Sequence, residues 1–433
     1  MSKQYLILGT GIAGLSAART IRLEDPEGMI TLIGAETDSP YLRPLLSKTD
    51  FRRLQRQKIL AAPEEWYEEN RITLLKGLAV ESLDPDRRQV LLSDGRILPY
   101  DKCIYALGAD CFVPPIPGRE KAGVLTLRSI ADFHHLRKRC MTAKTAVLIG
   151  GGVIGIEMAW ELTKLGIRCT ILEAMPRLMA RQLDEESAAR LKERIEAAGC
   201  GCFTGVQITS ITGQDQADGV DLADGRHFPA DLVILSTGVR PVTGPARRAG
   251  LVCDRGVVTS PQLLTSDPDI LAAGDCIQCG GPNPGLWNYA RISGEIAGYN
   301  VVHPEDPKTF EAGTFPLIMS AMNMGLFAAG ITAESEEVTA EVRCWENAEQ
   351  PDQFRVNEKA LGSAQRGSRG SVQGTALGTA PGGFLRAETY EKRFYRDNRL
   401  CGAVLIGDIS GMAEILDELE AIRGKYKAEE YNP

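Results

Sequence analysis

The sequence predicts an α/β protein with two parallel-sheet domains and a smaller C-terminal α+β domain. The glycine pattern G-x-G-x-x-G occurs twice, at residues 9–14 and 150–155, and each copy lies between a strand-like apolar run and a helix-like run. This context is typical of Rossmann-like dinucleotide-binding domains. The length of 433 residues is too great for one hydrophobic core and fits two or three domains. Two such patterns in one chain indicate two dinucleotides held face to face, and therefore electron transfer.

The composition excludes several classes of protein. Hydrophobic residues make up 43% of the chain and charged residues 24%, as in ordinary globular proteins, and the formal net charge of -8 argues against nucleic-acid binding. No run approaches the roughly 20 apolar residues of a membrane helix, and the first glycine pattern begins too early to leave room for a signal peptide. We therefore expect a cytoplasmic protein that binds neither nucleic acid nor membrane. The eleven cysteines follow no regular spacing, which favours reduced thiols over a disulfide framework.

The first glycine pattern stands at a strand-turn-helix junction, because residues 4–8 form an apolar strand and residues 13–22 carry helical apolar spacing. Gly9 would permit the tight turn, and Gly11 would let the backbone approach a pyrophosphate. Gly14 would let helix and strand pack closely at the positive helix terminus. The motif as a whole comprises Gly9, Thr10, Gly11, Ile12, Ala13 and Gly14.

The second pattern belongs to a complete β-α-β unit over residues 145–173, the clearest motif in the chain. Glu173 ends the second strand of this unit, where a carboxylate would bond the adenosine ribose 2′-hydroxyl and repel a 2′-phosphate. This position favours NADH over NADPH, whereas Arg177 and Arg181 would suit a phosphate and keep NADPH open. The glycine motif of the unit comprises Gly150, Gly151, Gly152, Val153, Ile154 and Gly155.

Two further motifs, YLRPLLSK at 41–48 and ILAAGDC at 270–276, complete a resemblance. Together with the first glycine pattern they resemble the two-dinucleotide-fold flavoprotein reductases that include rubredoxin, ferredoxin and putidaredoxin reductases. The similarity covers roughly residues 4–335, and three separated motifs agree in order and spacing. The C-terminal hairpin and helix also resemble those of nitrite-reductase-type flavoproteins. The resemblance implies FAD on the first fold and NADH on the second.

The resemblance also assigns residues to FAD. Gly274 and Asp275 match the motif whose aspartate binds the ribityl chain, although an aspartate here would also suit a helix N-cap. Glu36 is the acid available to the ribose after the strand at 30–33, unless it is only an exposed loop acid. Arg43 and Lys48 match cofactor-contacting cations of the family. Weaker assignments, to backbone or side-chain contacts with the cofactor, are Val80, Gly108 and Arg128.

Three residues, Lys48, Glu157 and Trp287, are candidates for positions beside the reacting atoms. Glu157 faces inward at the start of the second fingerprint helix, and a buried carboxylate needs a partner. In related reductases a lysine and a glutamate from these motifs form an ion pair near the flavin N5, and Lys48 and Glu157 match them. Trp287 resembles a tryptophan that packs at the flavin, with a core tryptophan as the alternative. Gly238, in the apolar strand 233–241, marks the return of the chain to the FAD domain.

The electron acceptor is inferred from what the sequence lacks. No cysteine precedes Cys103, so the C-x4-C pair of disulfide reductases is missing, as is their late His-Pro-Thr element. Electrons would therefore leave the flavin directly, to a protein carrier such as rubredoxin or ferredoxin. Alternatives are an NADH oxidase or quinone-type reductase, a thiol-disulfide reductase using Cys276 and Cys279, and a non-catalytic flavin-binding module. No metal site is predicted, because the Cys276–Cys279 pair lacks a second pair.

The sequence also predicts a docking surface and domain boundaries. The run 51–58 contains Arg52, Arg53, Arg56 and Lys58, a basic island that would steer an acidic carrier or would simply be a solvated face. The FAD-binding domain is predicted at 1–113 and 247–312, and the NAD(P)H-binding domain at 114–246. An interface domain follows at 313–433, with a flexible insertion at about 357–383, a hairpin turning at Asp397-Asn398 and a helix over 410–423. The resemblance also allows a homodimer through this last domain.

Overall fold

The structure is a computed structural model that describes residues 2–52, 54–311, 313, 315–346 and 388–420. The chain divides into two compact units, Met1–Ala174 with Cys200–Phe315, and Met175–Gly199 with Pro316–Pro433. The three-domain boundaries drawn from the sequence stay predictions. The insertion predicted at 357–383 lies outside the described residues.

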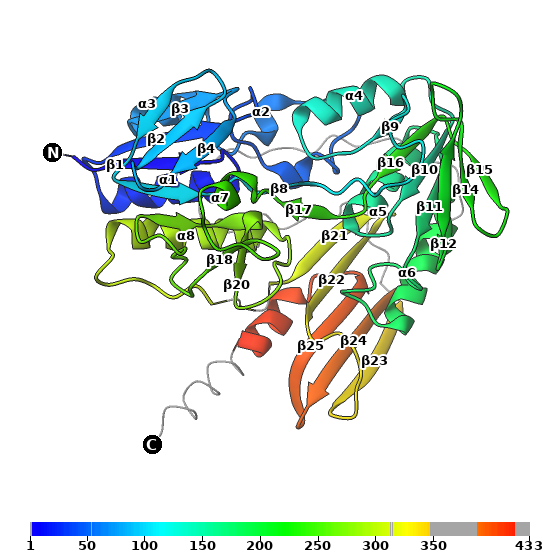
Figure 1. The fold of residues 1–433 in the computed structure, drawn as a ribbon. Helices are drawn as coiled ribbons and strands as arrows, with labels where there is room; N and C mark the ends of the chain where they lie inside the picture. The colour runs from blue at the N-terminus through cyan, green and yellow to red at the C-terminus, as the bar shows by residue number, and fades with distance from the viewer. Residues whose placement is uncertain (1, 53, 312, 314, 347–387, 421–433) are drawn as a thin grey trace. The chain divides into compact units, whose positions relative to one another are not determined.

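The first unit contains two five-stranded parallel sheets, which confirms the predicted α/β class (Figure 1). The first sheet has the strand order β19-β7-β1-β2-β3, and every neighbouring pair is parallel. Its central strand QYLIL is apolar almost throughout, as expected of a parallel strand covered on both faces. The strands are β1 (Gln4–Leu8), β2 (Met29–Gly34), β3 (Ile72–Lys76), β7 (Lys102–Tyr105) and β19 (Ile270–Ala272).

The second sheet has the order β12-β11-β10-β16-β9 and is also fully parallel. The predicted β-α-β unit is confirmed, since α5 (Val153–Lys164) connects β10 to β11. The run 233–241, predicted as an apolar strand closing on Gly238, forms one strand before a turn at Gly238, where φ is +97°, and a second short strand after it. The sheet consists of β9 (Val124–Leu125), β10 (Thr145–Ile149), β11 (Arg168–Glu173), β12 (Gly201–Thr204) and β16 (Leu232–Leu235).

Short strands and helices connect and flank these sheets. β8 (Ala109–Cys111) pairs with β17 (Val239–Pro241), so the chain passes to the second sheet and returns from it through two adjacent strands. The other strands are β4 (Val80–Asp84), β5 (Gln89–Leu92), β6 (Ile97–Pro99), β13 (Ile208–Thr212), β14 (Gly219–Leu222), β15 (His227–Pro229), β18 (Val257–Thr259) and β20 (Ile277–Cys279). The short helices are η1 (Arg43–Leu45), α2 (Arg56–Ile59), α3 (Glu64–Glu69), α7 (Gly244–Arg248) and η2 (Gly274–Cys276), and α4 (Ile130–Cys140) is longer.

The second unit combines α6 (Glu185–Ala197) with an antiparallel sheet of order β21-β22-β25-β24-β23. The predicted hairpin is confirmed: Asp397 and Asn398 have φ +51° and +58° and form a two-residue turn. The buried ammonium of Lys392 bonds Asp184 at 2.6 Å and Glu186 at 3.1 Å, which ties α6 to the sheet. Helical residues 412–420 follow the hairpin. The strands are β21 (Leu317–Ala321), β22 (Met324–Gly330), β23 (Val338–Glu346), β24 (Glu388–Arg396) and β25 (Arg399–Gly407).

A search of the described part of the chain for membrane-spanning helices finds none with the required length and hydropathy.

Two helices of the first unit approach each other unusually closely. α1 (Ile12–Glu24) begins in the first fingerprint, and α8 (Trp287–Val302) packs along it. A Cβ at Gly294 would lie 2.2 Å from the Ala13 carbonyl oxygen, and one at Gly298 would lie 2.6 Å from that of Ala17. The glycines of α8 therefore set the distance between this helix and the fingerprint helix.

We predict that Gly294→Ala lowers the free energy of unfolding by about 2 kcal/mol, because the added methyl group would overlap backbone of α1. Alanine ordinarily stabilises a helix interior by about 1 kcal/mol over glycine, so a loss would identify the close approach as its cause. Thermal unfolding followed by circular dichroism measures the change. The neighbouring Glu295→Ala is the control, since it removes only the surface ion pair with Arg291. A Gly294→Ala protein as stable as the wild type would contradict the prediction.

Candidate functional site

The two glycine fingerprints have the same backbone geometry. Their first glycines, Gly9 and Gly150, have φ +118° and +115°, and a Cβ there would lie 2.0 Å and 2.4 Å from the carbonyl oxygens of Ala106 and Ser236. These carbonyls follow the strands adjacent to β1 and β10, so only glycine lets the neighbouring chain approach. The third glycines are equally constrained, because a Cβ at Gly14 would lie 1.9 Å from the Gly9 oxygen.

The middle glycines are different, because they face open space. Apart from the adjacent residues of the chain, no described atom lies within 4 Å of an ideal Cβ on Gly11 or on Gly152. Each is the N-cap of its helix, and neither cap is satisfied by a side chain. The first amides of α1 and α5 are therefore available to an anion. The second motif also exposes the side chain of Ile154.

The carboxyl edge of the first sheet gathers the other predicted FAD residues. Loops after parallel strands meet at one edge, and here these are Glu36 after β2, Gly108 after β7 and Gly274 with Asp275 after β19. Val80 follows a segment whose Leu78 amide donates to the Gly34 oxygen at 2.9 Å. Asp275 lies within the short helix η2, so the helix N-cap alternative is not the arrangement observed.

Glu36 and Arg43 were predicted as separate contacts, and the structure joins them in one cluster. Arg43 Nη2 lies 2.7 Å from Glu36 Oε1, and the Tyr41 hydroxyl donates to Glu36 Oε2 at 2.7 Å. Burial lowers the pKa of the Arg43 guanidinium, but the nearby Tyr41 and Glu36 outweigh this effect and the net pKa is raised. Arg43 is therefore a charged side chain, held by Glu36 at the carboxyl edge of the first sheet.

Arg128 and Asp275 connect the two sheets. Arg128 follows β9 at the carboxyl edge of the second sheet, and its Nη2 lies 2.7 Å from Oδ2 of Asp275 at the carboxyl edge of the first. Arg43 also donates to the main-chain oxygen of Arg128. Two loops that are far apart in the sequence thus meet through charged side chains.

The expected contact between Lys48 and Glu157 is also present. Glu157 is 2% exposed on α5, and its Oε1 lies 3.4 Å from Nζ of Lys48, whose side chain is 34% exposed. The Ser47 hydroxyl donates to the other carboxylate oxygen, Oε2, at 2.5 Å. Phe51, from the same segment, stacks on Phe133 of α4 with ring centroids 5.0 Å apart. The segment after η1 therefore holds the elements of the two sheets together.

Sequence reasoning missed Ser47, Tyr41 and Phe51. Ser47 precedes Lys48 directly within the quoted YLRPLLSK element, so its place in the motif was a signal that was not used. Tyr41 begins the same element. Phe51 has no comparable signal, because its stacking partner lies on a distant part of the chain.

Glu173 lies beside the second fingerprint, where the sequence placed it. Its Oε2 accepts a hydrogen bond from the Gly151 amide at 2.6 Å. Arg177 donates to the carbonyl oxygens of Leu183 and Ala180, at 2.9 Å and 3.2 Å, within its own loop. The structure thus gives Glu173 a direct link to the glycine motif and gives Arg177 a local structural role.

Trp287 is the first residue of α8 and is half-buried. Its indole Nε1 is buried and has no hydrogen-bond partner among the described residues. A buried donor of this kind calls for an acceptor. The short helix η2 also contacts α8, because the Gly274 amide donates to the Ser293 hydroxyl at 3.0 Å.

Cys276 and Cys279 are both buried free thiols. Cys276 Sγ donates to the Ala273 oxygen at 3.1 Å, and Cys279 Sγ donates to the Ser260 oxygen at 3.5 Å. Burial raises the pKa of the Cys276 thiol to about 12. A thiol with this pKa is protonated at neutral pH and a poor nucleophile, which weakens the thiol-disulfide alternative.

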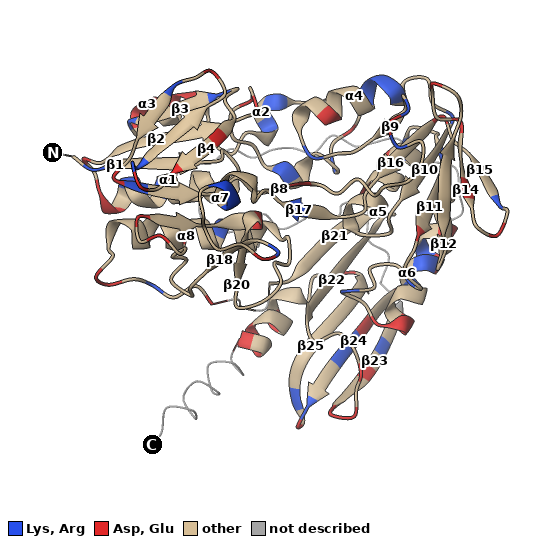
Figure 2. Ribbon diagram, viewed as in Figure 1, with Lys and Arg blue, Asp and Glu red and all other residues tan. Residues whose placement is uncertain are grey.

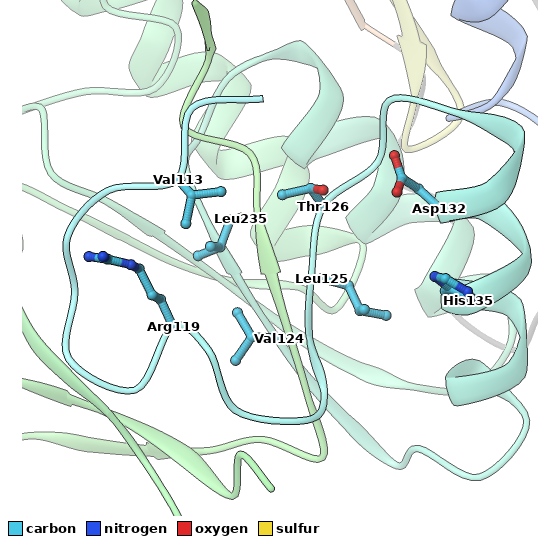
Figure 3. A pocket seen from close by; sticks show the side chains of 8 residues that line it. All are labelled: Val113, Arg119, Val124, Leu125, Thr126, Asp132, His135 and Leu235. Carbon is cyan, nitrogen blue, oxygen red and sulfur yellow. The ribbon is translucent and has the colours of Figure 1, made fainter. Parts of the chain in front are cut away.

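A cavity of about 210 Å³ opens beside the carboxyl ends of β16 and β9 (Figure 3). Leu235 and Thr126 line it from the sheet edge, and Asp132 and His135 line it from α4. Its other lining residues are Val113, Arg119, Val124 and Leu125. None of the predicted site residues belongs to its walls.

Comparison with known proteins places this geometry in context. The sequence profile described as pyridine nucleotide-disulphide oxidoreductase matches residues 3–294. The ferredoxin–NAD(+) reductase component of the biphenyl dioxygenase system of Paraburkholderia xenovorans is 37% identical over 269 residues, which cover 62% of this chain and 66% of that protein. A Bacillus subtilis nitrite reductase (NAD(P)H) is 32% identical over 339 residues, which cover 78% of this chain and 42% of that protein.

Among solved structures, a ferredoxin reductase from Rhodopseudomonas palustris superposes with a TM-score of 0.78 at 27% identity, covering 94% of this chain and 91% of that one. The match to the two curated relatives is less complete, since the chain spans 66% and 42% of their lengths.

We predict that Cys276 resists alkylation by iodoacetamide at pH 7.5 in the folded protein, because its buried thiol is protonated there. Its thiolate fraction rises with pH only as the solution nears pH 12, where the fold itself is challenged. Cys344, which is exposed, is the internal control and should react first. Peptide mass spectrometry before and after unfolding measures both. Equal labelling of the two cysteines in the native protein would contradict the prediction.

Proposed function

Because the chain belongs to the pyridine nucleotide-disulphide oxidoreductase family, we propose that it is an FAD-dependent NADH oxidoreductase that delivers electrons to a small protein carrier such as rubredoxin or ferredoxin. The supporting observation is the contact of Lys48 and Ser47 with Glu157, which joins the segment after the first sheet's β2 to the fingerprint helix of the second. Bound FAD would supply the switch between hydride and single-electron chemistry.

The residues of the first fold fit a dinucleotide such as FAD. The backbone at Gly11 is open, and the amides at the start of α1 face that space. The buried indole Nε1 of Trp287 has a proton to donate to a ligand acceptor. Arg43, Glu36 and Asp275 bring charge to the same sheet edge, and the other expected contacts are Val80, Gly108, Gly274 and Arg128.

The second fold would hold NADH. Gly152 is as open as Gly11, and Glu173 lies at the end of β11, next to the glycine turn. A carboxylate there favours a ribose hydroxyl over a phosphate, which supports NADH over NADPH. The exposed apolar side chain of Ile154 provides a surface for the ligand.

Lys48 and Glu157 would frame the place where the two dinucleotides meet. The Glu157 carboxylate is buried, so it balances and orients the ammonium of Lys48, whose side chain is partly exposed. The lysine charge is therefore held in one position without adding net charge to the site. Such fixed charges tune a cofactor without reorganising during the reaction.

The carrier would dock on a basic surface, defined by Lys58 of α2 and by Arg137 and Lys138 in the last turn of α4. Figure 2 shows basic residues on both helices, and the Phe51–Phe133 stack links the segment before α2 to α4. These three cations are exposed and form no ion pair within the described ranges. Of the predicted basic island, Arg52 and Arg56 pair with Asp50 and Asp38, and Arg53 lies outside the described residues.

The function is tested by anaerobic reduction of the purified flavoprotein. NADH should bleach the flavin absorbance faster than NADPH, and an acidic rubredoxin or ferredoxin should restore it faster than oxygen does. If NADH failed to bleach the flavin, the protein would be a non-catalytic flavin-binding module instead of a reductase. Fast reoxidation by oxygen alone would instead identify an NADH oxidase, and fast reoxidation by a quinone alone would identify a quinone reductase.

Valine at the two middle glycines should separate the cofactors. Gly11→Val and Gly152→Val add side chains into open space, so both proteins should fold, as checked by circular dichroism. Gly11→Val should lose bound FAD, because the side chain would fill the space of the pyrophosphate. Gly152→Val should keep FAD and lose NADH binding, measured by calorimetry. Loss of FAD from both variants, or from neither, would oppose the assignment.

Glu173→Ala should raise the KM for NADH about tenfold, as expected for loss of a hydrogen bond to a charged group. The KM for NADPH should stay constant or fall, because repulsion of the 2′-phosphate is removed. Steady-state kinetics with both nucleotides measures this split. An equal rise for NADH and NADPH would show that Glu173 acts only by holding the Gly151 amide.

Lys138→Glu should raise the KM for an acidic carrier about two- to fivefold at low ionic strength, the range for one surface charge pair. The effect should shrink in 0.5 M salt, because added ions screen exposed charges. Lys3→Glu carries the same change in charge at the amino end of β1 and is the control. Equal effects of Lys138→Glu and Lys3→Glu would argue against docking at α4.

A further inference from the structure

We propose that Ser47 is a positioning residue, which fixes the Glu157 carboxylate so that this carboxylate can orient Lys48. The inference rests on the proposed function and adds to it a neutral hydroxyl outside the charged pair. Ser47 and Glu157 are both 2% exposed, and 110 positions of sequence separate them. Their contact exists only because the two folds come together.

The geometry distinguishes the two oxygens of the carboxylate. Oε2 accepts from the Ser47 hydroxyl at 2.5 Å, while Oε1 faces Nζ of Lys48 at 3.4 Å. A hydroxyl donating to a carboxylate over 2.5–2.7 Å makes a charge-assisted bond, stronger than one between neutral groups. The short contact is with the serine and the longer one with the lysine. Ser47 therefore determines the orientation of the carboxylate plane, and this orientation determines where Oε1 meets the ammonium of Lys48.

The hydroxyl has one proton, and the structure indicates where it goes. Another acceptor within reach of the Ser47 hydroxyl is the Pro44 carbonyl oxygen, at the much longer distance of 3.4 Å. Because the proton is directed to Glu157, the buried charge has one donor that does not depend on the partly exposed lysine. The hydrogen bond from Ser47 thus holds the carboxylate in place independently of the lysine.

Ser47 also lies in a segment that is anchored by buried side chains. It follows η1, within a segment whose Leu46 and Phe51 are buried. Thr49, two residues later, offers a matched comparison, because its hydroxyl donates to the Leu45 oxygen at 2.6 Å within the same segment. Removing either hydroxyl perturbs this segment, but the Ser47 hydroxyl donates to Glu157 whereas the Thr49 hydroxyl donates to Leu45.

The test is a double-mutant cycle on the FAD-loaded protein with Ser47→Ala, Glu157→Ala and the double variant. Ser47→Ala should slow NADH-driven flavin reduction about tenfold while leaving the KM for NADH unchanged, since loss of such a bond is worth about one decade. In the Glu157→Ala background it should slow the reaction no further. Urea unfolding of the same four proteins should show coupling between the two positions, which is a readout independent of turnover. Thr49→Val should react like the wild type.

Four results would overturn the proposal. Ser47→Ala could react at the wild-type rate, it could lose the same fraction of rate with and without Glu157, or Thr49→Val could be equally slow. Coupling in unfolding without coupling in rate would make Ser47 purely structural and would also overturn it. If NADH fails to reduce the wild-type flavin, the proposed function fails instead, and the unfolding cycle still reports on the Ser47–Glu157 contact.

Discussion

The arrangement of the first unit depends on one buried charge, the carboxylate of Glu157. A carboxylate removed from water costs several kcal/mol unless donors compensate it. Ser47 donates a hydrogen bond to this carboxylate and Lys48 forms an ion pair with it. Both come from the segment that follows β2, while Glu157 itself stands on the helix that the second fingerprint begins. The two folds therefore cannot separate without exposing or orphaning this charge. The position that satisfies it also brings together the carboxyl edges of two parallel sheets, where each sheet has an open glycine backbone.

The other charged side chains of the site are also paired, but their desolvation costs less free energy because they are less buried than Glu157. Arg128 reaches from the second sheet to Asp275 of the first, and Arg43 holds Glu36 and touches the main chain of Arg128. A guanidinium has five donors in a fixed plane, so one arginine can hold a carboxylate and still present N–H groups elsewhere. These pairs therefore preorganise the sheet edge and leave donors for a ligand.

The sequence predicted those parts of the molecule that local rules determine. Gly9, Gly14 and their counterparts were recognised from the fixed spacing of the motif between a strand and a helix, and the structure gives the reason, since neighbouring carbonyls lie about 2 Å from a would-be Cβ. The contact of Glu157 with Lys48 came from family resemblance. The pairing of Arg43 with Glu36 and the stacking of Phe51 on Phe133 could not be predicted, because they depend on which distant segments the fold brings together. Ser47 was overlooked for a related reason: a short hydroxyl side chain has no periodic signature, and burial alone gives it importance.

The family takes its name from disulfide chemistry, yet this chain places no reactive thiol at the site. The segment Leu42-Arg43-Pro44 at the sheet edge contains no cysteine, and its arginine forms an ion pair with Glu36. The cysteine after Asp275 is buried and protonated, so it offers no alternative relay. Under the proposed function, electrons from the flavin would therefore pass to an external acceptor such as a protein carrier. Figure 2 shows basic residues on α2 and α4 of an otherwise acidic protein, a surface that would suit an acidic acceptor under this proposal.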